Sequence, residues 1–281
     1  MAVLDARFWR RQRWLVARRI VQAVLLAAFA AAPWWGSWLA RGTLASSLWF
    51  GTVPLTDPMV ALQSWLAGAP LARPALIGTA IVALFYLLTA GRLFCAWVCP
   101  VNLAADAAEG ARRALGLGNR GLLRADRRLR HGVLLLALGA SAVTGTVAWE
   151  AVNPINWTMR ALAFGLWGGG LVAFGGVFLF DLLVLRHGWC GHVCPVGAFY
   201  GWLGRFGRLH VKAVKPEACT NCGDCYVVCP EVQVIAPVLH PQAARRTIVD
   251  MDCLRCGRCI DQCDEDVFAF RLEARVSPSS K

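Results

Sequence analysis

Four long apolar stretches alternate with polar loops over the first two thirds of the chain. They cover residues 20–39, 74–91, 132–149 and 161–185. Each approaches the roughly 20 apolar residues that a helix needs to cross a bilayer. A single charge, Asp181, lies within them, near the end of the fourth. The pattern predicts an α-helical membrane protein with four transmembrane helices.

Basic residues are distributed unevenly among the flanking segments. Of the 29 Lys and Arg, six precede residue 20, two lie in the first loop, eight in the second, one in the third and twelve after residue 185. This alternation follows the positive-inside rule. It predicts a multi-pass protein of the bacterial inner (cytoplasmic) membrane with cytoplasmic N- and C-termini. It also explains the net charge of +12 without a nucleic-acid partner. A cleaved signal beginning at Arg18 and Arg19 is the alternative for the first stretch.

Composition supports the membrane assignment and adds metal chemistry. Hydrophobic residues make up 57% of the chain and charged residues 16%, below the quarter or so of a soluble domain. Thirteen Trp are typical of aromatic belts at membrane interfaces. All 12 Cys stand in C-x₃-C or C-x₂-C spacings, which indicates metal binding rather than a secreted disulfide scaffold.

The second and fourth apolar stretches end in the same motif, C-x₃-C-P-V, repeated 95 residues apart. The repeat predicts two helix hairpins in parallel arrangement within a membrane domain of residues 20–200. We expect the four thiols to converge and to hold a third iron–sulfur cluster or zinc, or to act as two redox dithiols. Small apolar packing residues are the plainer alternative. The four thiols are those of Cys95, Cys99, Cys190 and Cys194.

A second kind of cysteine run follows, with the spacing C-x₂-C-x₂-C-x₃-C, and it occurs twice. This is the bacterial ferredoxin run, in which the fourth Cys ligates the other of two [4Fe–4S] clusters. Zinc is a weaker alternative, because it does not explain the fourth Cys. The spacing predicts one cluster on Cys219, Cys222, Cys225 and Cys263, and another on Cys253, Cys256, Cys259 and Cys229.

The C-terminal composition predicts a separate domain. Residues 201–281 are expected to form a small cytoplasmic α+β ferredoxin-like domain, with strands at 211–214, 247–249 and 267–272. Residues 1–19 are expected to form a basic cytoplasmic N-terminus.

Taken together, these motifs resemble the NapH family, the membrane component of quinol dehydrogenases in periplasmic nitrate reductase systems. The likeness covers nearly the whole chain, including residues 53–58, 149–154 and 187–195. It implies electron transfer from quinol toward a periplasmic nitrate reductase. It also implies a periplasmic polyferredoxin partner of the NapG type, a membrane-anchored tetrahaem cytochrome of the NapC type, and the membrane quinone pool. Since the clusters are predicted to be cytoplasmic, the direction of electron flow stays open.

Quinol oxidation needs an apolar slot and a proton acceptor. Glu150, at the outer end of the third stretch, is the candidate proton acceptor. Asp57 and Pro58 are expected to begin a short interfacial helix. Asp181 is a further ionisable candidate, which Arg92 or Arg186 could neutralise. His192, between two candidate ligands, could donate to a sulfur.

Two other functions fit the same motifs. One is a redox assembly or maturation factor that reduces a metal or a thiol for a metalloenzyme. The other is a membrane scaffold with structural clusters. The sequence therefore leaves open whether the chain is an enzyme, and favours the electron-transfer subunit of a quinol dehydrogenase complex.

Overall fold

The computed structural model describes residues 9–35, 39–117, 125–240, 243 and 245–273. The chain divides into two compact units, each built from separate segments. The C-terminal unit comprises Met1–Gln22, Tyr86–Val98 and Tyr200–Lys281. The helical unit comprises Ala23–Phe85 and Cys99–Phe199. The two ends of the chain, whose cytoplasmic location is predicted above, lie outside the described residues.

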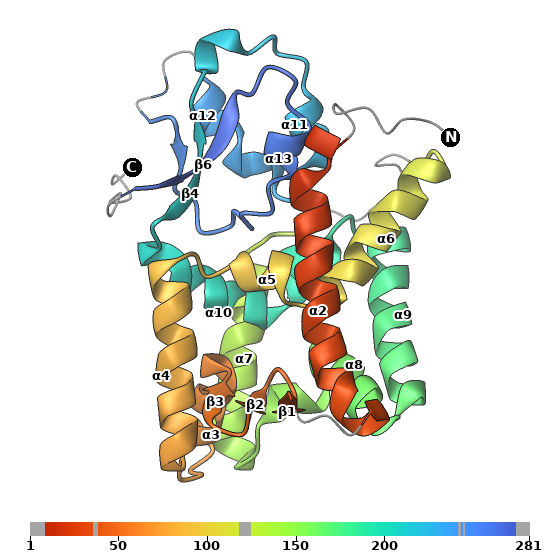
Figure 1. Ribbon diagram of the computed structural model, residues 1–281, viewed down its shortest axis with the longest axis vertical. Helices are drawn as coiled ribbons and strands as arrows, with labels where there is room; N and C mark the ends of the chain where they lie inside the picture. The colour runs from red at the N-terminus through yellow and green to blue at the C-terminus, as the bar shows by residue number, and fades with distance from the viewer. Residues whose placement is uncertain (1–8, 36–38, 118–124, 241–242, 244, 274–281) are drawn as a thin grey trace. The chain divides into compact units, whose positions relative to one another are not determined.

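A three-stranded antiparallel sheet organises the C-terminal unit (Figure 1). Its order is β5 (Thr247–Ile248), β4 (Leu209–Ala213), β6 (Phe268–Leu272). All three strands overlap the stretches predicted from apolar runs, so these predictions are confirmed. The helices and 3₁₀ turns that accompany the sheet are η3 (Gly204–Phe206), η4 (Pro216–Ala218), α11 (Asp224–Val228), η5 (Val232–Val234), α12 (Ala236–Leu239) and α13 (Arg258–Asp261).

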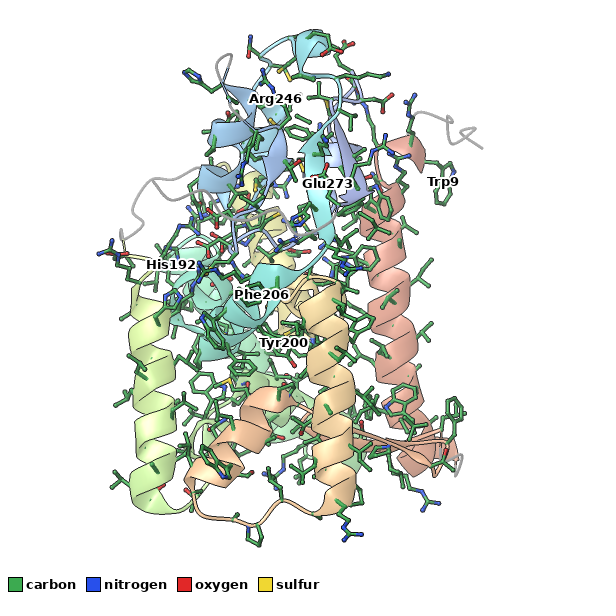
Figure 2. All side chains as sticks on the ribbon, turned by 90° about the vertical axis from the view of Figure 1, so that its left-hand side faces the viewer. Trp9, His192, Tyr200, Phe206, Arg246 and Glu273 are labelled. Carbon is green, nitrogen blue, oxygen red and sulfur yellow. The ribbon has the colours of Figure 1, made fainter. Side chains whose placement is uncertain are left out.

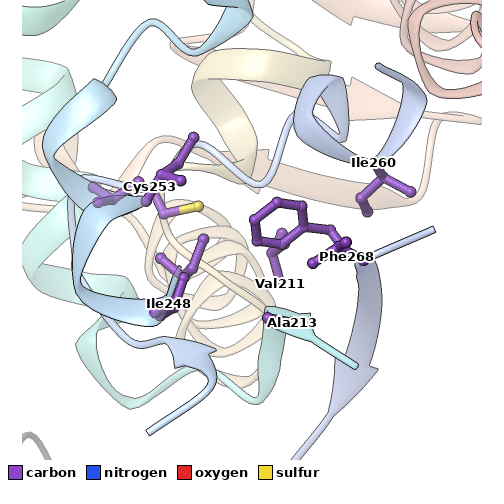
Figure 3. Close-up of a cluster of buried hydrophobic side chains, with 10 residues drawn as sticks. Val211, Ala213, Ile248, Cys253, Ile260 and Phe268 are labelled. Atoms are coloured by element: carbon purple, nitrogen blue, oxygen red, sulfur yellow. The ribbon is translucent and has the colours of Figure 1, made fainter. Parts of the chain in front are cut away.

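One face of this sheet forms a hydrophobic core (Figure 3). Val211 and Ala213 stand two residues apart on β4, and side chains at that spacing share a face of a strand. Ile248 and Phe268 from the neighbouring strands pack against them. Cys253 lies in the same cluster, so the core is continuous with a cysteine run.

Two segments distant in sequence complete the unit. The first is the start of α2 (Arg13–Trp35), and the second contains α5 (Leu93–Trp97). Gly91 lies so close to α10 (Pro195–Leu203) that a Cβ atom there would stand 1.6 Å from the carbonyl oxygen of Tyr200. Tyr200, labelled in Figure 2, stacks on Phe94 with ring centroids 4.7 Å apart. Glycine at position 91 therefore permits a close backbone approach that any other residue would block.

A buried ion pair joins the α5 segment to the cysteine-rich part of the unit. Arg92 is fully buried, and its Nη1 donates to Glu231 Oε1 at 2.8 Å and to the carbonyl oxygen of Asp252 at 2.7 Å. Glu231 is 1% exposed. Because an unpaired buried charge is strongly unfavourable, each partner needs the other.

The helical unit consists mainly of helices. Asp57 caps α3 (Pro58–Leu66), accepting hydrogen bonds from the backbone N–H groups of Met59 and Val60, and Pro58 follows at the first helical position. The N-cap prediction is therefore confirmed. The unit also contains a small antiparallel sheet of β1 (Ala40–Gly42), β2 (Ser46–Trp49) and β3 (Val53–Thr56). Its other elements are α3 (Pro58–Leu66), α4 (Arg73–Leu88), α6 (Val101–Ala114), α7 (Leu129–Thr144), η1 (Ala148–Ala151), α8 (Pro154–Phe164), α9 (Trp167–Leu183) and η2 (Trp189–Val193).

The prediction of four transmembrane helices in two repeated hairpins is wrong. Among the described residues, one helical stretch is long and apolar enough to cross a membrane, Arg13–Ala31, with a mean hydropathy of 1.6. Helices α4 and α7 have 16 residues each and α9 has 17. At 1.5 Å per residue they span about 24–26 Å, less than the roughly 30 Å of a hydrocarbon core. The multi-pass topology is accordingly not supported.

Two glycines explain why the third and fourth apolar stretches do not form longer helices. Gly145, with φ +66°, forms the left-handed C-cap of α7. Gly165, with φ +69°, does the same for α8. Glycine adopts this conformation without steric cost and commonly ends helices. As a result, the fourth apolar stretch is divided between α8 and α9.

Replacing Arg92 with Met should destabilise the C-terminal unit by roughly 3–5 kcal/mol, because Glu231 would stay buried without its partner. Arg10→Met is the matched control, since Arg10 pairs with Asp266 at the surface with its side chain 62% exposed. That change should cost less than about 1 kcal/mol. Denaturant unfolding of the purified protein measures both, and equal effects would contradict the role assigned to Arg92.

Candidate functional site

Two cysteine loops in the C-terminal unit have matching backbone conformations. In the first, Asn221 and Gly223 have φ values of +56° and +85°. In the second, the equivalent Arg255 and Gly257 have φ values of +50° and +78°. Left-handed residues on both sides of the middle Cys fold each C-x₂-C-x₂-C run into a tight loop. Short helices, α11 and α13, follow the two loops.

The first cysteine set surrounds a cavity of about 280 Å³. Burial is the main cause that raises the pKa of the Cys225 thiol to about 11, and the neighbouring Cys222, Cys219 and Cys263 contribute to the same rise. Cys263 comes from the second run, so the structure brings the fourth thiol across to the first loop. The four cysteines that line the cavity are Cys219, Cys222, Cys225 and Cys263.

The second set gathers in the reciprocal way. Burial raises the pKa of the Cys229 thiol, and Cys256 and Cys253 add to that effect. Burial also raises the pKa of Cys259, with contributions from Cys256, Cys253 and Cys229. Cys229 belongs to the first run and interacts with the three thiols of the second. We call Cys219, Cys222, Cys225 and Cys263 the first set, and Cys229, Cys253, Cys256 and Cys259 the second set.

The donor sets fit iron–sulfur clusters better than single ions. Within the described part of the chain, no three His, Cys, Asp or Glu side chains could hold one metal ion. A zinc ion would require thiolates at only about 2.3 Å. Grouped, partly buried thiols instead fit a larger cationic centre. Its charge would offset the burial and mutual repulsion that raise the pKa values of Cys225, Cys229, Cys253 and Cys259.

The C-x₃-C-P motifs have less regular surroundings. Cys95 lies in α5, in the C-terminal unit, whereas Cys99, Cys190 and Cys194 belong to the helical unit. Cys190 lies in η2, a short π-helical turn, and Cys194 follows it in extended conformation. The convergence of the four thiols stays a prediction.

Glu150, the candidate proton acceptor, lies in η1 of the helical unit. Its pKa is raised to about 7, mainly by burial; the hydrogen bond from Asn153 Nδ2 opposes this rise and the charge of Asp57 contributes to it. Next to it, the backbone N–H of Trp149 donates to Gln63 Oε1 at 3.1 Å. Ser141 Oγ lies 3.2 Å from the same oxygen. A carboxyl that titrates near neutral pH therefore adjoins a buried polar cluster.

The other ionisable candidates, Asp181 and His192, lie among residues whose contacts stabilise the fold. Asp181 Oδ1 accepts a hydrogen bond from the backbone N–H of Trp189 at 2.9 Å. Arg186 forms a two-point ion pair with Glu109, so it is engaged elsewhere than with Asp181. Burial lowers the pKa of His192, and nearby Arg127 and Arg130 lower it further. Neutral His192 lies within the turn between two candidate ligands.

Sequence reasoning missed the residues that cover the second cysteine loop. The indole N–H of Trp97 donates to the carbonyl oxygen of Arg255 at 3.1 Å. The backbone N–H groups of Trp14 and Leu15 both donate to Asp261 Oδ2 at 3.0 Å, so a distant carboxylate caps the start of α2. Opposite charges on the N-terminal segment and the cysteine-rich domain are the one signal that could have indicated this contact.

Two family models match the chain. One, described as a 4Fe-4S binding domain, matches residues 71–118 and again 166–213. These matches lie 95 residues apart and each includes one C-x₃-C-P motif, which supports the sequence repeat. The other, described as a 4Fe-4S dicluster domain, matches residues 211–264 and contains both ferredoxin runs.

Curated proteins resemble nearly the full length of the chain. The ferredoxin-type protein NapH of Escherichia coli is 46% identical, covering 94% of this chain and 91% of its own. NapH of Haemophilus influenzae is 42% identical, with coverages of 94% and 91%. The methylamine utilization ferredoxin-type protein MauN of Methylorubrum extorquens is 47% identical, with coverages of 96% and 93%. No solved structure matches the chain significantly.

Glu150→Gln should change how stability depends on pH. Since the folded-state pKa of Glu150 is raised from 4.5 to about 7, folding favours its protonated form. The contribution of this carboxyl to the free energy of unfolding is therefore largest below pH 4.5 and is lost as the pH rises through 7. Between pH 5 and pH 8 the free energy of unfolding of the native protein should therefore fall by on the order of 2 kcal/mol because of this group, and that of the variant should not show this fall.

Denaturant unfolding of the detergent-solubilised protein at the two pH values measures this difference. Glu265→Gln, at an exposed position, is the control and should follow the native protein. An unchanged pH dependence in Glu150→Gln would show that Glu150 titrates as an ordinary carboxylate.

Proposed function

Because the chain belongs to the NapH family of ferredoxin-type proteins, we propose that its C-terminal unit binds two [4Fe–4S] clusters and transfers electrons. The crossed arrangement of the two cysteine sets carries this proposal. Cys263 lies with the first loop and Cys229 with the second, as expected where the fourth Cys of each run ligates the other cluster. When bound, such clusters accept and release single electrons.

The chain's own residues would control these electrons through their environment. Eight thiolates would hold the iron. Hydrogen bonds, nearby charge and solvent exposure then set the potential of each cluster. The C-x₃-C-P cysteines are proposed to form a further redox centre, either a third cluster or two dithiols, and the 4Fe-4S binding-domain matches over both motifs support this.

We propose that the electrons come from the membrane quinol pool. The helix over Arg13–Ala31, by its length and composition, supports association with a membrane. Quinol oxidation releases two electrons and two protons, so it needs a base close to an apolar surface. Glu150, with a pKa of about 7 beside Trp149 and the buried Gln63, is proposed as the proton acceptor.

The proposed destination is a periplasmic nitrate reductase, reached through partners of the NapG and NapC types. The relatives that support this assignment are the proteins named NapH in Escherichia coli and Haemophilus influenzae. A second destination, a methylamine-utilization system, is supported by the nearly equal similarity to MauN, at 47% identity against 46% for NapH of Escherichia coli.

Removing one ligand from each set tests the two-cluster proposal. Cys222→Ser and Cys256→Ser should each abolish a different EPR signal of the reduced protein and lower iron and labile sulfide by the content of one [4Fe–4S] cluster per chain, because each set organises its own cluster. Trp202→Phe, at a surface site 64% exposed, should retain both signals. Full iron content in either cysteine variant would refute the ligand assignment.

Genetic replacement distinguishes the two destinations. The gene should be placed in one strain lacking its own NapH and in another lacking its own MauN. We expect restored quinol-dependent nitrate reduction in the first strain, and a loss of that activity with Glu150→Gln. Restoration of growth on methylamine alone would transfer the assignment to the second destination.

A further inference from the structure

We propose that the two cysteine sets serve different electron partners. The second set exchanges electrons inside the chain with the redox centre of the first C-x₃-C-P motif, and the first set exchanges them with a separate, basic redox protein. This assignment rests on the proposed electron-transfer function and adds to it an order of centres.

Equivalent positions of the two cysteine loops differ sharply in exposure. In the first loop Thr220, Asn221 and Cys222 are all exposed. In the second, the counterparts of the first two, Leu254 and Arg255, are 5% and 2% exposed. Because the backbone conformations match, the difference arises from what packs on each loop. The second loop is covered by other parts of the chain, and the first faces solvent.

The paired glycines identify one element of this cover. A Cβ atom at Gly257 would lie 2.6 Å from Cβ of Trp14. At Gly223 the same atom would meet no described atom within 4 Å. Trp14 also packs edge-on against Phe270, with ring centroids 4.7 Å apart. The start of α2 thus closes the second loop and leaves the first open.

The other element of the cover comes from the C-x₃-C-P motif itself. Trp97 stands between Cys95 and Cys99, and its indole N–H donates to the carbonyl oxygen of Arg255 at 3.1 Å. Arg255 directly precedes Cys256. A short path of covalent bonds and one hydrogen bond therefore runs from the Cys95 segment to a ligand of the second set.

The surface at the first set suits a protein partner of opposite charge. Cys222 is itself exposed, and the cavity it lines also includes the exposed Asp224 and Glu265. A soluble redox protein with a basic face could bring its own centre close to this opening, since charge complementarity steers such encounters. At the second loop, by contrast, Leu254 and Arg255 are buried and Cys256 is half-buried.

The transfer between centres would be a one-electron exchange, with Cys95 and Cys99 among the ligands of a third iron–sulfur cluster and a quinol as the reductant. The quinol would be oxidised to the quinone, and its two electrons would pass one at a time from the third cluster to a cluster on the second set, then to one on the first set, and then to the partner's oxidised centre. The two quinol protons would leave at the quinol site, so no bond would form or break in the relay.

Solvent access provides the first test, on the full-length holoprotein. The Cys222→Ser and Cys256→Ser variants identify which EPR signal belongs to each set. A soluble dysprosium chelate should then enhance the spin relaxation of the first-set signal several-fold more than that of the second. Equal enhancement, or the reverse order, would overturn the proposal.

Trp97→Phe provides the second test, because it removes the indole N–H and keeps an aromatic ring. The Arg255 carbonyl would lose its donor, so the second-set signal should move to a more negative midpoint potential, with the first-set potential unchanged. Reduction of the clusters by a quinol analogue should slow several-fold. Trp202→Phe is the control and should alter neither value. A shift confined to the first set would contradict the proposed order.

These outcomes separate the two proposals. Two signals with full iron content but the opposite order of access would reject the assignment of partners and leave the two-cluster function intact. Absence of both signals from iron-loaded protein would reject the proposed function itself. If Trp97→Phe loses iron, the relaxation measurement on the native protein still decides the order.

Discussion

The buried contact between Arg92 and Glu231 is the constraint on which the C-terminal unit depends. It carries a charge from the segment between α4 and α5 into the interior of the cysteine-rich part, where Asp252 supplies a second acceptor. Neither charge could remain buried alone. The contact therefore holds the first C-x₃-C-P segment against the second cysteine loop, and the Trp97 hydrogen bond extends the same junction.

Local chemistry explains what could be predicted from the sequence. Short apolar runs specified β4, β5 and β6, because the pattern of a small sheet is set by its own side chains. Asp57 and Pro58 specified the start of α3 in the same local way. The cysteine spacings indicated the grouping of thiols, since the fourth Cys of each run has only one role in the ferredoxin pattern.

Backbone conformation and long-range contacts explain what could not be predicted. Hydropathy is blind to the left-handed conformations of Gly145 and Gly165, which end helices inside apolar sequence. The count of basic residues along the chain likewise gave no indication that Arg10 and Arg11 pair with Asp266 and Asp264. Such pairs join residues more than 250 positions apart, and no periodicity in a single sequence reveals them.

Family membership and geometry constrain different aspects of the function. Similarity to NapH and MauN extends over nearly the entire chain at nearly equal identity, so the shared part is the electron-transfer core. The distinction between destinations must then lie in surfaces that recognise partners. The exposed first loop is a surface of that kind, and it is separate from the junction that holds the unit together.

The discontinuity of the C-terminal unit has a consequence for biosynthesis. Trp14 contacts Asp261 across 247 positions, so the N-terminal turn of α2 leaves the ribosome long before its partner exists. High contact order of this kind slows folding. The cysteines of the second set span residues 229–259, and Trp14, which covers their loop, contacts Asp261 and Phe270 still closer to the C-terminus. Any cluster bound by that set would therefore gain its full cover only after these residues have been synthesised, and a fragment beginning at residue 201 would lack both Trp14 and Arg92.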